Sequence, residues 1–385
     1  MSVFDIKTIR KIKIEPKRRS HRKPTKHRKT KIEPKRRSHR LTAMKYFNFL
    51  SLIILFASAC TQKEDKQTSS DPDFSNVKVS VNIQRLDKEL FACQNKEELI
   101  EFFDKYPTFI SDYFQITSAG FDELSDQLLP LIQNQGLRDF YKQSQGPAFF
   151  GGQSLENEFR TAFQHIKYYY PTFKEPKIYT IFSGFFGQGY LKTPELTVSD
   201  SAIYIGLDYF MGRKGKYLPD VYDYQLRKTI PEAVVPQTVL LLSQRYNATS
   251  KEKTLLSDMV WYGKSFVFAH TMMPEKADSL LIGYTTKQID ESYTFQKNIW
   301  AHFIDNQLLY NTQDPIKAKY VGERPTTPEI GKSCPGTIGR WLGWRIVGKY
   351  FDENEKMTIT ELMKMTNAQK IFEASKYKGL PDEEL

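Results

Sequence analysis

The chain has 385 residues with 56 basic and 45 acidic side chains, so its formal net charge is +11. Residues 1–43 hold 17 of the basic and 3 of the acidic residues, which leaves 39 basic and 42 acidic residues, a net charge of about −3, in the rest. This balance excludes a broad basic surface for nucleic acid beyond residue 43. Three cysteines without a Cys-x-x-Cys pair exclude a disulfide framework and a cysteine-rich zinc site.

Residues 1–43 contain a repeat, because the decapeptide KIEPKRRSHR occurs at 13–22 and again at 31–40. Like charges at this density do not build a core, and by themselves they are typical of an arm that binds nucleic acid. That interpretation conflicts with the export signal that follows. We therefore interpret residues 1–43 as a basic repetitive extension that results from a misplaced start codon. Met44 is then the true first residue, and the extension is left out of the fold.

Residues 44–59 have the order of a lipoprotein signal peptide. Lys45 follows Met44, an apolar run covers 47–56, and small residues precede Cys60. The run is shorter than the ~20 residues that a membrane-spanning helix needs. Ala57-Ser58-Ala59-Cys60 resembles a lipobox, with Ala where Leu is usual. We expect fatty acyl chains such as palmitate on Cys60; the alternative is an ordinary signal peptide with an incidental cysteine.

Residues 60–76 are polar and predict an anchor followed by a flexible tether. Gln62-Lys63-Glu64-Asp65 resembles a tag for surface export in Bacteroidetes or is only a solvated linker, so the periplasmic and the surface-exposed face both stay open. The globular domain is predicted to span 77–385. Alternation predicts a strand at 77–83, and helical spacing of apolar residues predicts helices at 85–91, 99–106, 121–134 and 155–169.

In the middle of the chain the spacing of apolar residues changes from helical to alternating, and in the last third it becomes helical again. Strands are predicted at 177–182, 196–198 and 202–207, with a glycine-rich turn after the first. Helices are predicted at 231–246, 255–272, 299–310, 338–350, 359–365 and 368–376, and Thr358-x-x-Glu361 has the form of a capping box. This order predicts an α+β fold, mostly helical with a small central sheet.

A strand group followed by a helix is where a zinc peptidase would carry His-Glu-x-x-His. Here residues 230–237 offer Glu232 but no histidine, and Pro236 is expected to disturb a helix that continues from Pro231. We therefore predict no metal, no cofactor and no catalytic residue. Glu232, His270 and His302 are kept as a possible relic site, although Glu232 after a proline also suits a helix dipole.

The segment 334–350 is the most distinctive block of the sequence. Gly339 and Gly343 are four residues apart, a spacing that favours a dimer face in membranes. Because Arg340 and Arg345 lie in the same segment, we predict a helix packed closely on a neighbour in the same body. Whether the remaining cysteines, 93 and 334, form a disulfide is left open.

Five features are distinctive as a set: the lipobox at Cys60 and the segments 81–87, 204–210, 324–329 and 335–350. Together they resemble the GldB family of gliding-motility lipoproteins from Bacteroidetes, over nearly all of the chain beyond the basic extension. The resemblance implies a fold distantly similar to zincin-type peptidases that lacks the zinc-binding histidines. It also implies an envelope protein held to the membrane at Cys60 and associated with other envelope or gliding-machinery proteins.

Three functional classes follow from these observations. The first is a non-enzymatic envelope lipoprotein of the gliding machinery that acts through protein-protein contacts. The second is a zincin-like peptidase or other hydrolase with a degenerate or unorthodox active site. The third is an envelope lipid or glycan binder, suggested by the aromatic runs 168–170 and 261–262, which also suit a core.

The signal predicts the mature N-terminus. Mass spectrometry of the native protein is expected to find acyl chains on Cys60 and no peptide from residues 1–43, because translation starts at Met44 and the signal peptide is removed before Cys60. The Cys60→Ala variant is expected to stay unprocessed. Recovery of peptides from residues 31–40 in cells would contradict the start at Met44.

Overall fold

The computed structural model describes residues 72–152, 154–186 and 193–380. The predicted signal peptide, Cys60 and the basic extension lie outside these residues. The described residues from Phe74 onward belong to one compact unit. Helices α1 to α15 span Leu86–Ala92, Lys96–Lys105, Pro107–Phe109, Phe121–Gln133, Gln135–Ser144, Ser154–Tyr169, Val234–Ser243, Leu255–Met272, Asp278–Ile282, Thr286–Thr294, Gln296–Asp305, Asp314–Val321, Ile338–Asp352, Ile359–Lys364 and Ala368–Ser375.

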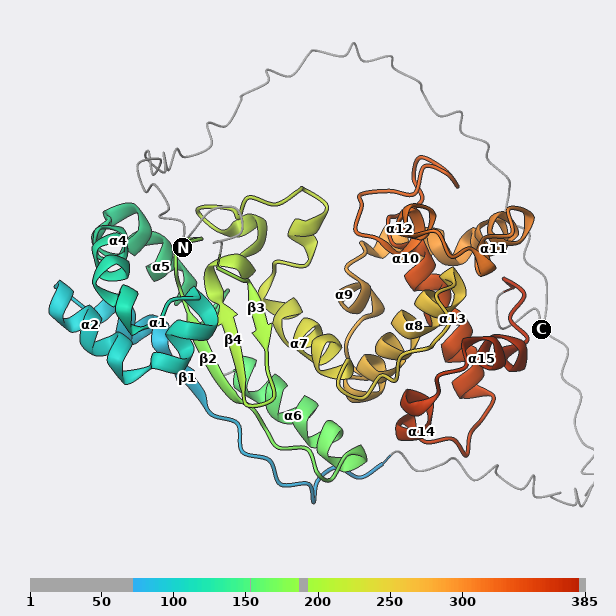
Figure 1. Cartoon of the computed structure of the whole chain (residues 1–385), viewed down its shortest axis with the longest axis horizontal. Helices are drawn as coiled ribbons and strands as arrows, with labels where there is room; N and C mark the ends of the chain where they lie inside the picture. Colours follow the sequence, from blue (N-terminus) through green and yellow to red (C-terminus); the bar gives the residue numbers. More distant parts are fainter. Residues whose placement is uncertain (1–71, 153, 187–192, 381–385) are drawn as a thin grey trace, which may run out of the picture. The chain divides into compact units, whose positions relative to one another are not determined.

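A small mixed sheet lies within this unit, between the first helices and the later ones (Figure 1). Its strand order is β1 (Ile83–Arg85), β2 (Lys177–Ile181), β4 (Ala202–Gly206) and β3 (Leu196–Val198). The first three run parallel, and β3 pairs antiparallel with β4 through a short hairpin. Every residue of β4 is buried, as expected for a central strand with both faces covered. The predicted α+β class is confirmed.

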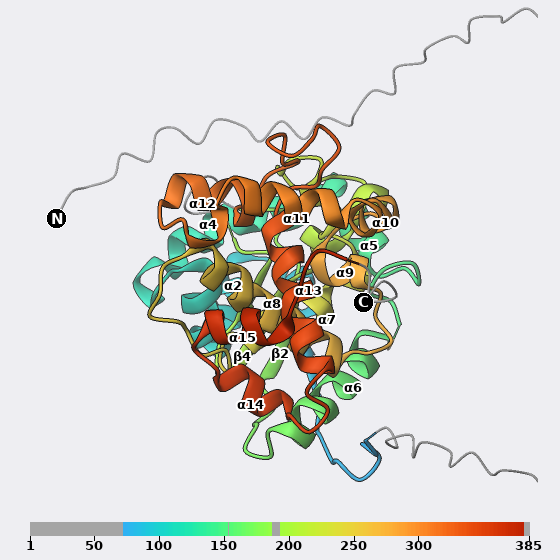
Figure 2. The same cartoon turned by 90° about the vertical axis from the view of Figure 1, so that its right-hand side faces the viewer.

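The last third of the chain is built around the crossing of α8 and α13. Figure 2 shows α13 running through the middle of these helices, with α15 beside it. A side chain on Gly343 would overlap the carbonyl oxygen of Met259, and one on Gly263 would overlap the carbonyl oxygen of Gly343. Phe266 stacks on Trp344 with ring centroids 5.0 Å apart. The predicted close packing of the 338–350 helix on a neighbour is therefore confirmed.

A buried lysine links α8 to the end of α14. Lys264 is 2% exposed, and its ammonium donates to the carbonyl oxygens of Ala248 (2.9 Å), Met365 (2.7 Å) and Met363 (3.4 Å). Burial lowers the pKa of Lys264 to about 8. The three acceptors match the three protons of the ammonium form. Lys264 therefore donates to carbonyl groups at the C-terminus of α14 that have no partner within the helix.

Several predicted elements match the structure closely. The predicted strand 196–198 and helix 255–272 coincide with β3 and α8, and the capping box at Thr358 forms with both of its hydrogen bonds. The predicted strand at 77–83 is wrong, because only Ile83 of that segment pairs with another strand. Its alternation is nevertheless real: residues 77, 79 and 81 are half-buried and residues 78, 80 and 82 are exposed.

Two further expectations are settled around α7 and the cysteines. Residues 231–233 form a 3₁₀ turn, and α7 begins only at Val234, so Pro236 sits in its first turn, where amide protons have no helical acceptor. No α-helix continues from Pro231, which agrees with the expected disturbance of such a helix, and the predicted helix 231–246 is shortened to Val234–Ser243. Cys93 and Cys334 are both free thiols. Within the described part of the chain, no helix combines the length and the apolar character that a membrane span requires.

The helix crossing predicts opposite effects for two glycines of α13. Gly343→Ala is expected to lower the free energy of unfolding by about 3 kcal/mol, because the new methyl group meets backbone that cannot move aside. Gly348→Ala is the matched control, since a side chain there meets nothing within 4 Å; it is expected to stabilise by about 0.5–1 kcal/mol. Urea unfolding of both variants measures the difference, and equal midpoints would contradict the close crossing.

Candidate functional site

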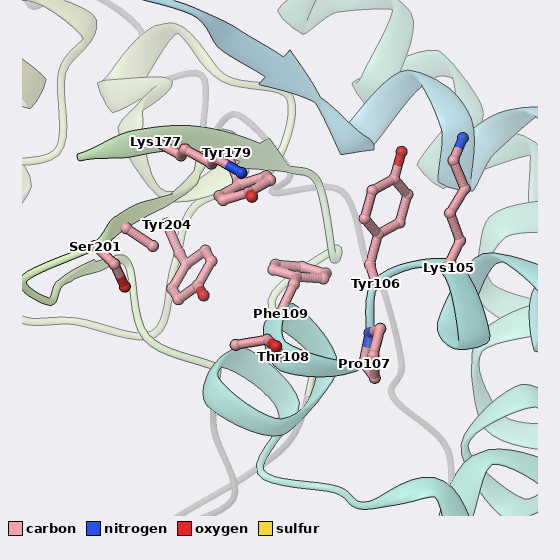
Figure 3. Close-up of a pocket in the computed structure, with 10 residues that line it drawn as sticks. Lys105, Tyr106, Pro107, Thr108, Phe109, Lys177, Tyr179, Ser201 and Tyr204 are labelled. Carbon is pink, nitrogen blue, oxygen red and sulfur yellow. The ribbon is translucent and has the colours of Figure 1, made fainter. Parts of the chain in front are cut away.

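An open cavity of about 310 Å³ lies against one face of the sheet. Its lining comes from residues 105–109, which include the end of α2 and all of α3, and from Lys177 and Tyr179 of β2 (Figure 3). Ser201, Ala202 and Tyr204 complete it. The parallel register places Tyr179 opposite Tyr204 and next to Gln84 of β1, so these three side chains share a face of the sheet. The volume is at the lower end of the range found for small-molecule sites.

Three aromatic rings form the inner wall of this cavity. The centroid of Tyr204 is 5.5 Å from that of Tyr179 and 5.4 Å from that of Phe109. Phe109 and Tyr204 are buried, whereas Tyr179 is half-exposed and presents its ring to the opening. Figure 3 shows the three rings gathered together, with Tyr106 standing to one side. The rings pack on each other, which fixes their orientation before any ligand arrives.

Two of the tyrosine hydroxyls are already engaged by the protein. The Tyr204 hydroxyl donates to Asp112 at 2.9 Å, and burial, followed by this hydrogen bond, raises the pKa of Tyr204. The Tyr106 hydroxyl donates to Glu89 at 2.9 Å and accepts from Gln84 at 2.6 Å. These bonds hold the rings in place, so the two hydroxyls act as supports of the cavity wall.

Glu89 also receives Lys105, whose ammonium lies 2.9 Å from the carboxylate. Lys105 therefore points along Tyr106 and away from the three rings, as Figure 3 shows. The remaining polar groups of the wall are Lys177, Thr108, Ser201 and the hydroxyl of Tyr179. None of these four makes a side-chain hydrogen bond or ion pair with another described residue. They are the groups that remain available to a ligand.

The carboxyl ends of the parallel strands carry a second set of polar groups, where ligands of parallel sheets often bind. Asp87 follows β1 and is fully buried. It accepts hydrogen bonds from Arg85 at 2.8 and 2.9 Å, from Thr180 at 2.5 Å and from Tyr141 at 3.2 Å. Gln145 adds a longer bond at 3.4 Å. A carboxylate with this many partners ties β1, β2 and α5 together.

Asp208 follows β4 and is 1% exposed. One of its oxygens accepts the backbone N–H of Phe185 at 2.7 Å and the hydroxyl of Ser183 at 3.2 Å. The other oxygen and the nearby buried hydroxyl of Tyr113 have no hydrogen-bond partner among the described residues. Burial raises the pKa of Asp208 to about 6, against the hydrogen bonds, which lower it.

The residues kept as a possible relic site do not form a joint cluster. Glu232 is exposed in the 3₁₀ turn before α7. His270, on α8, lies 3.6 Å from Asp278, and His302, on α11, shares a 2.9 Å hydrogen bond with the hydroxyl of Tyr320. Burial lowers the pKa of His302. In the described ranges no group of three or more His, Cys, Asp or Glu is placed to hold a metal ion.

The aromatic runs that suggested a lipid or glycan binder lie outside the cavity lining. Tyr170 stacks on Tyr246 with centroids 3.9 Å apart, and the guanidinium of Arg340 covers the ring of Tyr262 at 4.2 Å. Tyr168 is 43% exposed. These rings therefore serve mainly to pack helices against each other.

Sequence reasoning missed the cavity and both buried carboxylates as functional candidates. The signal for the cavity was present, because alternation in 177–182 places Lys177 and Tyr179 on one face. The contribution of residues 105–109 carried no such signal, since it depends on how α2 meets the sheet. Asp87 and Asp208 were noticed only as members of distinctive segments, although each is the second residue after a strand.

The buried carboxylate predicts a specific pH dependence. The pKa of Asp208 in the folded state lies above its value in the unfolded state. Its favourable contribution to the free energy of unfolding is therefore present below about pH 4 and is lost as the pH rises through about 6. The Asp208→Asn variant stays neutral and should gain about 2–3 kcal/mol relative to the original chain between pH 4 and pH 8. Urea unfolding of both proteins at pH 4, 6 and 8 measures this difference; a difference independent of pH would contradict the raised pKa.

Comparison with known proteins gives one result on family. Searches of curated proteins and of solved structures find no match. The similarity to zincin-type peptidases, expected from the sequence, therefore stays a prediction. The model of one family, described as gliding motility protein GldB, matches residues 67–379 and so includes the sheet, the cavity and the helix crossing. The chain belongs to the GldB family of gliding motility proteins.

Proposed function

We propose that the chain is a lipoprotein, anchored at Cys60, that serves the gliding machinery through protein-protein contacts rather than catalysis. Family membership associates it with gliding motility and with the cell envelope. The observation that carries the proposal is the extent of the match, which starts within the predicted tether and runs through the compact unit to residue 379. What the family shares is thus the whole body, not a short motif.

The state of the buried carboxylates supports contact rather than catalysis. A general acid or base must come within hydrogen-bond reach of its substrate. Asp87 is enclosed and fully engaged by neighbouring side chains, and Asp208 is 1% exposed beneath the turn at Ser183. Asp87 holds chain segments together, and the Asp208 oxygen that has partners binds residues 183 and 185, so neither carboxylate is presented to a substrate.

The predicted anchor also fits the layout of the chain. Thirteen residues lie between Cys60 and Phe74, where the compact unit begins, and a fully extended tether over these fourteen positions reaches roughly 50 Å. Two or three acyl chains bind a membrane durably, whereas a single chain is marginal. The body would then be held close to the membrane while remaining able to contact neighbouring envelope proteins.

Complementation of a gliding bacterium that lacks its own family member tests this proposal. The unmodified chain is expected to restore colony spreading, and Cys60→Ala is expected to abolish it, because the body is no longer held at the membrane. The triple variant Glu232→Gln, His270→Gln, His302→Gln is expected to spread like the unmodified chain, since these side chains would have no catalytic role.

The controls separate the two functional classes. Immunoblots must show each variant at the level of the unmodified chain, and Tyr168→Ala serves as a matched surface change. Loss of spreading in the triple variant at normal protein level would favour the peptidase alternative. Failure of the unmodified chain to restore spreading would contradict a role in the machinery.

A further inference from the structure

We propose that the cavity between the sheet and residues 105–109 binds an acidic saccharide, with one sugar ring packed on Tyr179 and its carboxylate paired with Lys177. This binding function is additional to the proposed role in gliding and does not depend on the anchor at Cys60. It rests on the shape of the cavity, its free polar groups and its charge.

The cavity offers an aromatic platform that is already rigid. Tyr179 is half-exposed, and its ring is flanked by Tyr204 at 5.5 Å and Phe109 at 6.5 Å. Tyr204 is fixed in turn by its hydrogen bond to Asp112. The flat face of a pyranose carries C–H groups that pack on such a ring, and a platform that needs no reordering loses little entropy on binding.

The free polar groups around this platform suit a ligand with many hydroxyls. The hydroxyls of Tyr179, Thr108 and Ser201 are not used by other described residues, and each can both donate and accept. Sugar hydroxyls have the same dual capacity. Each hydrogen bond that these groups make with water can therefore be replaced by a hydrogen bond with a sugar hydroxyl. An acyl chain could not, because it would leave the hydroxyls without partners.

Charge then selects among saccharides. Lys177 is exposed at the start of β2 and has no carboxylate partner among the described residues, whereas Lys105 is neutralised by Glu89. A ligand carboxylate would supply the missing partner of Lys177. The same ammonium repels a cationic ligand, which excludes the use of the three rings as a cage for quaternary ammonium groups.

The position of the cavity disfavours an extended peptide. It opens on the face of β2 and β4, and β2 is bonded on both sides, to β1 and to β4. A peptide that binds by adding a strand needs a free edge. The volume of about 310 Å³ suits one or two sugar rings rather than a long segment.

Two tetrasaccharides of equal length test the proposal on the whole chain purified in detergent. Hyaluronan tetrasaccharide alternates glucuronic acid with N-acetylglucosamine, and chitotetraose has N-acetylglucosamine alone. Isothermal titration calorimetry is expected to detect hyaluronan tetrasaccharide with a Kd at or below about 1 mM and chitotetraose several-fold more weakly. Added salt should weaken only the first, since only it pairs with Lys177.

Four variants identify the site. Tyr179→Ala is expected to weaken binding of both saccharides about tenfold, and Tyr179→Phe, which keeps the ring and the fold, by no more than about threefold. Lys177→Met is expected to weaken hyaluronan tetrasaccharide about threefold to fivefold and leave chitotetraose unchanged. Lys297→Met, an exposed lysine of α11 outside the cavity, is the matched control and should change neither.

Three results would overturn the inference. The first is no heat of binding for either saccharide at concentrations of about 5 mM. The second is binding that is unchanged in both Tyr179→Ala and Lys177→Met. The third is displacement of hyaluronan tetrasaccharide by a tetraglutamate peptide whose own binding depends on Lys177 but not on Tyr179, which would indicate a general anion site.

Discussion

The crossing of α8 and α13 is the constraint on which the helical part of the body depends. At Gly263 and Gly343 the two backbones approach so closely that neither position has room for a side chain. Close approach lets the flanking rings of Phe266 and Trp344 stack, and it lets α12 and α15 pack against α13. Lys264, one residue after Gly263, then binds two carbonyl groups at the end of α14 and the carbonyl group of Ala248. The crossing of α8 and α13 thus arranges three neighbouring helices, α12, α14 and α15.

The sheet positions polar side chains at two places, one buried and one exposed to solvent. At the carboxyl ends of the strands, Asp87 and Asp208 are buried and bind neighbouring segments. On one face, near the starts of β2 and β4, Tyr179 and Lys177 are open to solvent beside rigid rings. The buried set explains how a small sheet is secured, and the open set explains how the same sheet can present a binding surface.

Much of this architecture was predictable from local sequence, and the parts that were not have physical reasons. Strands 196–198 and 202–207 and helix 255–272 follow from alternation and from an apolar run, since both patterns reflect burial directly. Short helices such as Asp278–Ile282 carry too few residues for a period to show. The predicted strand at 77–83 alternates correctly but lacks a partner along most of its length, and no local pattern encodes pairing. The cavity likewise arises from three segments far apart in the sequence, 105–109, 177–179 and 201–204, so only folding reveals it.

Native-state hydrogen exchange tests most directly whether the α8–α13 crossing underlies the stability of the body. Amides of Val260, Phe266, Leu342 and Val347 are predicted to be among the slowest, exchanging only by global unfolding and with one common free energy. The amides of Thr108 and Phe109, in the short helix at the cavity, should exchange faster, by local opening. Fast exchange in the middle of α8 or α13, at a free energy well below that of global unfolding, would contradict this view of the crossing.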